Sequence, residues 1–313
     1  MHRDRRRRTD ELRQLASEEN WEELYRRLML WEFPHEARMG WQLAFLRPFA
    51  VPRMASTLVK AGHLVDNPLK RAYDTGLIIY EIVYGGVNSP RGRQMISVMN
   101  RAHHGRNILD EDMTYVLCAF IVAPMRYIDH AGWRPLSTAE RRSSLEFYTA
   151  MGRIMNIRDI PVSYADAERV FDDYERANVR ASGDAQVLGR NLLAVLKGRL
   201  PAVARPLAGP LFATQLNDAR IAAALGIRTP TPALQTVANG VAHLHGLIQR
   251  QLSPATTPVF TPGMKAGRLY PTGYQLEQLG PPSSVNDAAT GAAKADSGPR
   301  VPPNSSNQHI DIV

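Results

Sequence analysis

The residues best suited to chemistry lie in two neighbouring segments, and the first segment carries Arg71, Asp74 and Thr75. They stand at i, i+3 and i+4, with Ile78 at i+7, so a helix would place all four on one face. A guanidinium, a carboxylate and a hydroxyl would then head a row that is otherwise apolar. Such a group could stabilise an oxyanion and relay protons, although an Arg–Asp pair at this spacing is more often a surface ion pair.

The second segment carries two adjacent histidines, His103 and His104. His103 follows Ile96 by seven residues and Met99 by four, so it shares their apolar face, whereas His104 shares a face with polar residues. Imidazole is a common metal ligand, but a histidine on an apolar face is more often a hydrogen-bonded core residue. Of the two, His103 is the better ligand candidate.

Three consecutive helices should position these side chains. Asn67–Pro68 and Ser89–Pro90 each place a capping residue before a proline, which is typical of helix starts, and Gly85–Gly86 should end the first helix. A third helix should start at Asp110, where acidic residues favour the helix dipole. It contains the run 113–122, which is apolar nearly all round and predicts burial on most sides.

Motifs of one known family occur in four runs of the sequence: Leu69–Gly76, Met99–His103, Asp110–Leu117 and Gly132–Pro135. These runs resemble the haem-dependent oxygenases that include the fungal mycophenolic-acid pathway oxygenase and the bacterial latex-clearing rubber oxygenases. The resemblance extends from about residue 33 to about residue 174. It implies an all-α fold, a single helical domain around one b-type haem pocket.

The resemblance also implies roles for individual residues. His103 matches the axial iron ligand on the proximal side, and Arg71 and Thr75 match a distal pair that contacts the cofactor and takes part in catalysis. Asp74 stands where the rubber-cleaving members carry a lysine, which argues against their distal-lysine chemistry and against rubber as substrate. Asp74 could instead fix Arg71 or relay protons. The glutamate base of the rubber-cleaving members has no counterpart that we can place.

Composition narrows the function classes. The 313 residues are 44% hydrophobic and 22% charged, which is ordinary for a globular protein with a sizeable core. The single cysteine, Cys118, lies in an apolar run and should be buried and inert. One cysteine excludes an internal disulfide and a four-cysteine zinc or iron–sulfur site. No nucleic-acid module is recognisable, so we expect no nucleic-acid partner.

The N-terminus is basic, with Arg3 and residues 5–8 supplying much of the net charge of +8. Such a run is most often a solvated arm and less often a contact for anionic lipid or nucleic acid. No signal-peptide core follows it, and no run of about eighteen apolar residues occurs. We therefore expect a cytoplasmic protein that could touch a membrane surface through its basic N-terminus.

The chain should divide into three parts. Residues 1–30 form a basic arm and a polar amphipathic helix, 31–253 an all-α catalytic domain, and 254–313 a largely disordered tail rich in Pro, Gly and Ser. Pro124 should break or kink the third helix, placing Arg126 in a loop.

Arg126 or Arg134 could pair with haem propionates, although an exposed arginine is the more common case. Further helices are expected at about 183–198, 210–225 and 232–252.

The leading hypothesis is a haem b oxygenase that uses dioxygen to oxidise or cleave a carbon–carbon double bond in an apolar substrate, with isoprenoids as one class. Two alternatives stay open. One is a haem-binding sensor or carrier without turnover. The other is a non-haem helical scaffold whose basic arm binds acidic membranes.

Overall fold

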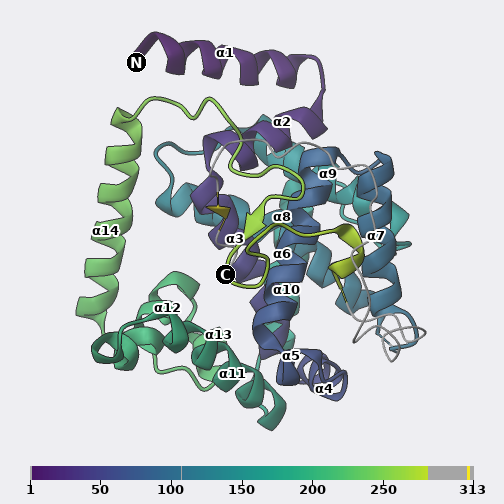
Figure 1. Ribbon diagram of the computed structural model, residues 1–313, viewed down its shortest axis with the longest axis vertical. Helices are drawn as coiled ribbons and strands as arrows, with labels where there is room; N and C mark the ends of the chain where they lie inside the picture. The colour runs from purple at the N-terminus through teal and green to yellow at the C-terminus, as the bar shows by residue number, and fades with distance from the viewer. Residues whose placement is uncertain (1, 107, 281–308, 311–313) are drawn as a thin grey trace.

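The computed structural model describes residues 2–106, 108–280 and 309–310 of the 313. The regular secondary structure of the described chain is almost entirely helical, which confirms the all-α prediction (Figure 1). Its α-helices are α1 (His2–Ser17), α2 (Trp21–Arg27), α3 (Pro34–Leu46), α4 (Pro52–Lys60), α5 (His63–Asp66), α6 (Pro68–Gly85), α7 (Pro90–His103), α8 (Asp110–Ala131), α9 (Thr138–Ile154), α10 (Tyr164–Asn178), α11 (Gly183–Arg199), α12 (Ala208–Leu216), α13 (Ala219–Ala224) and α14 (Pro232–Gln251). The shorter elements are η1 (Leu28–Glu32), η2 (Arg47–Ala50), η3 (Ala202–Leu207), η4 (Leu276–Gln278), β1 (Lys265–Ala266) and β2 (His309–Ile310).

Helix α8 runs through the middle of the fold and packs against α3, α9, α10 and α14 (Figure 1). The predicted break at Pro124 is wrong, because α8 continues to Ala131 and includes Arg126. Gly40 of α3 explains the difference. A Cβ at Gly40 would lie 2.3 Å from the Cα of Pro124, so a glycine is needed for the two helices to approach there. Packing of α3 against α8 outweighs the cost of a proline inside the helix.

Two hydrophobic cores share helix α3. The larger is built mainly from α2, α3, α6, α8 and α9, and the smaller from α3, η2, α11, α12 and α13. On α3, Trp41 packs into the first core and Leu43 into the second. Helix α3 therefore couples the two halves of the body.

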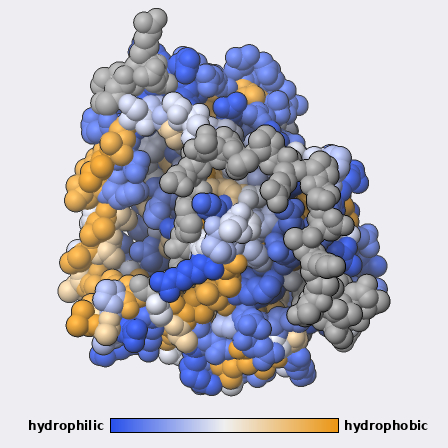
Figure 2. All heavy atoms as spheres, viewed as in Figure 1, coloured by the Kyte–Doolittle hydropathy of each residue, from blue (hydrophilic) through white to orange (hydrophobic). Residues whose placement is uncertain are grey.

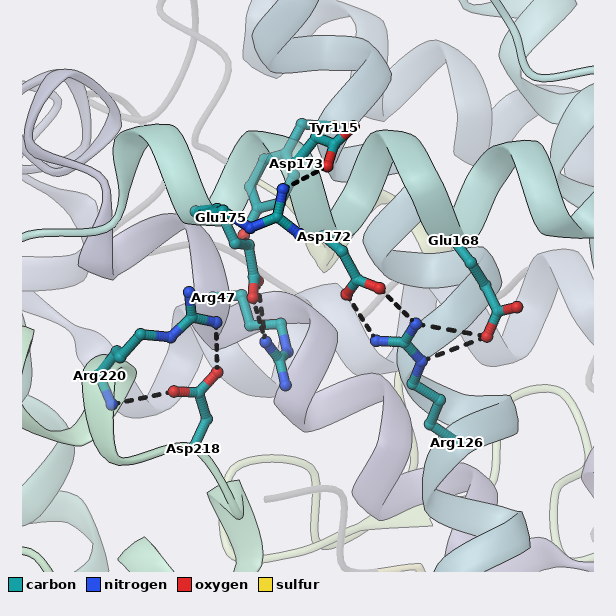
Figure 3. A network of polar contacts seen from close by, with 10 residues as sticks. Arg47, Tyr115, Arg126, Glu168, Asp172, Asp173, Glu175, Asp218 and Arg220 are labelled. Atoms are coloured by element: carbon teal, nitrogen blue, oxygen red, sulfur yellow. Dashed lines mark hydrogen bonds and ion pairs between the residues drawn. The ribbon is translucent and has the colours of Figure 1, made fainter.

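A polar network joins α8 and α10 to η2 (Figure 3). The hydroxyl of Tyr115 donates to the buried carboxylate of Glu175 at 2.9 Å, and Arg47 donates to the same carboxylate at 2.8 Å. Arg126 of α8 donates to Asp172 of α10 at 2.7 Å. Each of these contacts joins two different elements, so the network fixes α10 across α8.

The N-terminal arginines lie on a helix and not in an extended arm. Helix α1 includes residues 5–8, and Glu19, with a φ of 53°, separates α1 from α2. A left-handed residue cannot continue a right-handed helix, so the expected amphipathic helix is divided in two.

The predicted helices 183–198 and 232–252 correspond to α11 and α14. The predicted helix 210–225 is divided into α12 and α13 by Asn217, which adopts the left-handed conformation with a φ of 47°.

Residues 254–280 were expected in a disordered tail, and for this stretch the prediction is wrong. Phe260 is fully buried, Tyr270 and Tyr274 are nearly so, and the Tyr274 hydroxyl donates to the buried carboxylate of Glu81. These aromatic side chains have no helical period, so a search for periodicity misses them although they supply the burial that orders the segment.

The rest of the expected tail, residues 281–308 and 311–313, lies outside the described residues. Among the helices that the structure describes, none is both long and apolar enough to cross a membrane.

Candidate functional site

Helices α6 and α7 begin where the sequence predicted and lie side by side. Helix α6 starts at Pro68 and is followed by Gly86, whose φ of 92° ends it. The hydroxyl of Ser89 accepts a hydrogen bond from the backbone N–H of Gly92 at 2.9 Å and caps α7. A Cβ at Gly92 would lie 2.0 Å from the carbonyl oxygen of Gly86. The tight turn therefore holds the two helices against each other.

A largely apolar cavity lies between α4, α6, α7, α8 and α9. Arg71, Thr75 and His103 all line it. The centre of a water molecule can occupy about 180 Å³ of this cavity, and the space between its walls is about 1300 Å³ with the open mouth included. Much of the remaining wall is flexible and polarisable, since five methionines line it. They are Met54, Met99, Met113, Met151 and Met155.

Arg71 and Thr75 form a hydrogen-bonded pair in the cavity wall. The guanidinium of Arg71 donates to the Thr75 hydroxyl, and that hydroxyl donates to the backbone carbonyl of Arg71 at 2.8 Å. Burial lowers the pKa of Arg71, and the negative charge of Asp74 opposes this shift. Arginine nevertheless stays protonated in proteins, so the cavity contains a half-buried cation.

The hydrogen bonding of His103 leaves one ring nitrogen able to act as a ligand. Its Nδ1 lies 2.7 Å from the backbone carbonyl oxygen of Met99. A carbonyl only accepts, so Nδ1 carries the proton and Nε2 keeps its lone pair. Nε2 has no hydrogen-bond partner among the described residues. Burial lowers the pKa of His103, and the positive charges of Arg71 and Arg106 lower it further, so the imidazole is neutral at pH 7.

His104 takes a different position from His103. It is the exposed C-terminal cap of α7, and its backbone N–H donates to the carbonyl of Asn100 at 2.9 Å. The structure therefore brings Arg71, Thr75 and His103 to one cavity and leaves His104 at the surface.

Asp74 does not line the cavity with Arg71, and its hydrogen-bond partners lie elsewhere. Its buried carboxylate accepts hydrogen bonds from Lys70, from the Tyr270 hydroxyl at 2.6 Å and from the backbone N–H of Gly280 at 3.2 Å. Neither of its oxygens bonds Arg71 within the described residues. Its charge still acts on the pKa of Arg71, but its contacts fasten residues 254–280 to α6.

A second charged group in the wall was missed by sequence reasoning. Arg53 of α4 donates from Nε to the buried carboxylate of Asp112 at 3.0 Å, and the Tyr174 hydroxyl donates to the same carboxylate. Both Arg53 and Asp112 line the cavity. A signal existed, because Asp112 precedes Val116 and Phe120 by four and eight residues and so shares their face.

A smaller apolar cavity adjoins the first and shares Thr75 and Phe120 with it. The centre of a water molecule can occupy about 80 Å³ of it. Tyr80 lines this cavity, with its ring packed edge-on against Trp41 at a centroid distance of 5.1 Å. The buried Tyr80 hydroxyl has no hydrogen-bond partner in the described part of the chain. No sequence pattern had singled out Tyr80.

The two arginines considered for propionates lie elsewhere. Arg126 points toward α10, as Figure 3 shows, and Arg134 donates to Glu140 at 2.6 Å and to Glu32 at 3.3 Å. Neither lines the cavity. The arginines that do are Arg53 and Arg71.

Comparison with known proteins agrees with this geometry. Residues 36–250 match the family model described as ER-bound oxygenase mpaB/B'/Rubber oxygenase, catalytic domain. The ER-bound oxygenase mpaB' of Penicillium brevicompactum is 26% identical to the chain, over 71% of the chain and 57% of that protein. The ER-bound oxygenase mpaB of Penicillium roqueforti is 31% identical, over 40% of the chain and 44% of that protein.

The chain thus spans about half the length of the curated relatives it matches. The match to the family model covers most of the chain and contains every residue that lines the larger cavity except Gly280. The chain belongs to the family of ER-bound oxygenase mpaB/B'/rubber oxygenase catalytic domains.

Proposed function

We propose that the chain is a haem b-dependent oxygenase that uses dioxygen to oxidise or cleave a carbon–carbon double bond of an apolar substrate. The observation that carries this proposal is the meeting of three residues at one apolar cavity: His103 with an unbonded Nε2, and the Arg71–Thr75 pair. Membership of an oxygenase family supports the reaction class.

The cavity fits a haem in its chemistry. A haem needs as few as one iron ligand from the protein, and the neutral imidazole of His103 would supply it. The apolar walls suit a macrocycle, and Arg53 could neutralise a propionate. A bare metal ion has less support, because the described residues contain no cluster of three His, Cys, Asp or Glu side chains.

When bound, the haem would supply the electron chemistry with dioxygen that amino-acid side chains cannot provide. The residues around the cavity would hold the haem and polarise the reacting groups. Met99 keeps the His103 ring in the tautomer that presents Nε2, and Thr75 keeps the Arg71 guanidinium in the wall. Arg71 has further N–H groups that can donate to negative charge developing on oxygen. Asp74 would act indirectly, by fastening α6.

The substrate proposal rests on the two adjoining cavities, whose walls are predominantly apolar. An apolar alkene, with isoprenoids as one class, fits such walls. We also propose a cytoplasmic location with contact to a membrane surface. The curated relatives are named ER-bound, which describes those proteins.

The test combines a spectrum with isotope incorporation. The full chain is reconstituted with haemin and its Soret band and haem stoichiometry are measured. A panel of apolar alkenes that includes squalene is then supplied under ¹⁸O₂. One haem per chain and ¹⁸O in a product support the proposal. Haem binding without incorporation for any alkene would indicate a sensor or carrier, and absence of a Soret band would indicate a non-haem scaffold.

A further inference from the structure

The outward face of α14 is a stripe of large apolar side chains. Val237, Val241, Leu244 and Ile248 stand at i, i+4, i+7 and i+11, and each is at least half exposed, from 50% for Ile248 to 63% for the two valines. Leu247 flanks them and is also exposed. Figure 2 shows this stripe as an orange band over α14 along the left edge of the molecule.

The amphipathic pattern of α14 is the reverse of that of an ordinary surface helix. Its inward face combines small and polar residues: Gly246 is buried, and Ala238, Ala242 and His245 are partly buried. A Cβ at Gly246 would lie 3.0 Å from the carbonyl oxygen of Gly132, so the small residue permits close docking. A surface helix normally turns its large apolar residues toward the core. Here the large residues face outward, which marks an interaction surface.

Arginines surround the C-terminal end of this stripe. Arg5 donates to the carbonyls of Gln249 and Leu252, and Arg8 donates to the carbonyl of Ala255 at 2.6 Å. These contacts place the basic part of α1 across the end of α14.

Exposed arginines near the stripe add positive charge, and α14 has no negative charge to neutralise it. Arg6, Arg7 and Arg250 are exposed, with Arg7 in an exposed ion pair with Glu11, and α14 contains no acidic residue. The whole chain has a net charge of +8. An apolar helix face bordered by exposed arginines has the composition of an interfacial membrane helix.

We propose that the outer face of α14, together with the arginines of α1, is a docking surface for an anionic lipid bilayer. The stripe would lie at the boundary between headgroups and acyl chains, and the arginines would contact lipid phosphates and carboxylates. Charge decides against a second copy of the chain as occupant. Two copies that each carry a net charge of +8 repel each other, whereas an anionic surface neutralises the arginines. The surface is independent of haem binding.

The experiment is vesicle flotation of the full chain. The vesicles are phosphatidylcholine alone or phosphatidylcholine with phosphatidylserine. The double variant Val241→Glu, Leu244→Glu adds two negative charges on the stripe. Its matched control, Asn239→Glu with His243→Glu, adds the same charges to the polar face of the same helix. We expect the stripe variant to lose anionic-vesicle binding at least tenfold, roughly the burial of one large apolar side chain, and the control to lose much less.

A second pair of variants tests the arginines. Arg6→Gln with Arg7→Gln should weaken binding to anionic vesicles by about fivefold for each arginine and leave binding to neutral vesicles unchanged. Thermal unfolding by circular dichroism checks that every variant is folded. Equal binding by the stripe variant and its control, or no binding of wild type to anionic vesicles, would overturn the proposal. A wild-type dimer in sedimentation that the stripe variant abolishes, without vesicle binding, would assign the face to self-association.

Discussion

The Arg71 guanidinium donates to the Thr75 hydroxyl one helical turn further along α6, and that hydroxyl donates back to the Arg71 carbonyl. The pair is closed by its own helix, so it does not depend on any other element for its orientation. The cavity thus holds a pre-positioned cation, which costs little to reorganise when negative charge develops nearby.

Arg71→Ala should retain haem and lose substrate oxidation. The side chain lies on α6, whereas the proposed axial ligand His103 lies on α7, so its removal would take away a donor and not the anchor. Loss of one such donor typically costs about a hundredfold to a thousandfold in turnover. The control is Arg101→Ala, which removes an exposed arginine of α7. Normal turnover of a true substrate by Arg71→Ala would show that the distal assignment is wrong.

Two truncations should behave differently. Ending the chain after Ser253 removes Phe260, Tyr270 and Tyr274 from the core and should lower the thermal midpoint by roughly 10 °C or more. Ending it after Gly280 keeps these residues and the Asp74 contacts but removes β2 with its buried Ile310, so we expect a much smaller fall in the midpoint and an unchanged haem content. A large loss on the second truncation would show that residues beyond 280 also stabilise the body.

Tyr80→Phe should leave the free energy of unfolding unchanged or increase it, because the buried hydroxyl lacks a partner and its removal abolishes a desolvation cost. Tyr115→Phe is the matched control. Its equally buried hydroxyl donates to Glu175 at 2.9 Å, so its loss should cost about 1.5–3 kcal/mol. Urea unfolding measures both variants. Equal destabilisation of the two would mean that Tyr80 has a partner in solution.

Cys118 should resist thiol reagents in the folded protein. Burial raises the pKa of its thiol to about 12 from 9.0, so almost no thiolate exists at pH 8. The unfolded chain ionises first as the pH rises. The contribution of this group to stability is therefore complete below about pH 9 and is lost between pH 9 and 12. Labelling by a chromogenic disulfide should need denaturant, and rapid labelling of the native protein at pH 8 would contradict this.

Local periodicity was enough to predict α6 and α7 and to separate His103 from His104, because a helix of this length fixes which side chains share a face. It was not enough for Asp74. The partner of that carboxylate, Tyr270, is 196 residues away and lies in a segment without a helical period.

Pro124 and Arg53 illustrate the same limit of local reasoning. The helix through Pro124 depends on Gly40 of α3, and Arg53 reaches Asp112 from α4. Each depends on a tertiary neighbour that composition and spacing do not reveal. Family resemblance identified the polar residues of the cavity on α6 and α7 but not Arg53 on α4.

Haem content of a glycine variant with added imidazole tests the central claim most directly. His103→Gly should lose the Soret band of reconstituted protein, and free imidazole should restore it by occupying the space that the side chain leaves. His104→Gly should retain haem without imidazole, since that residue is at the surface. Full haem content in His103→Gly without imidazole would contradict the assignment of His103 as the axial ligand.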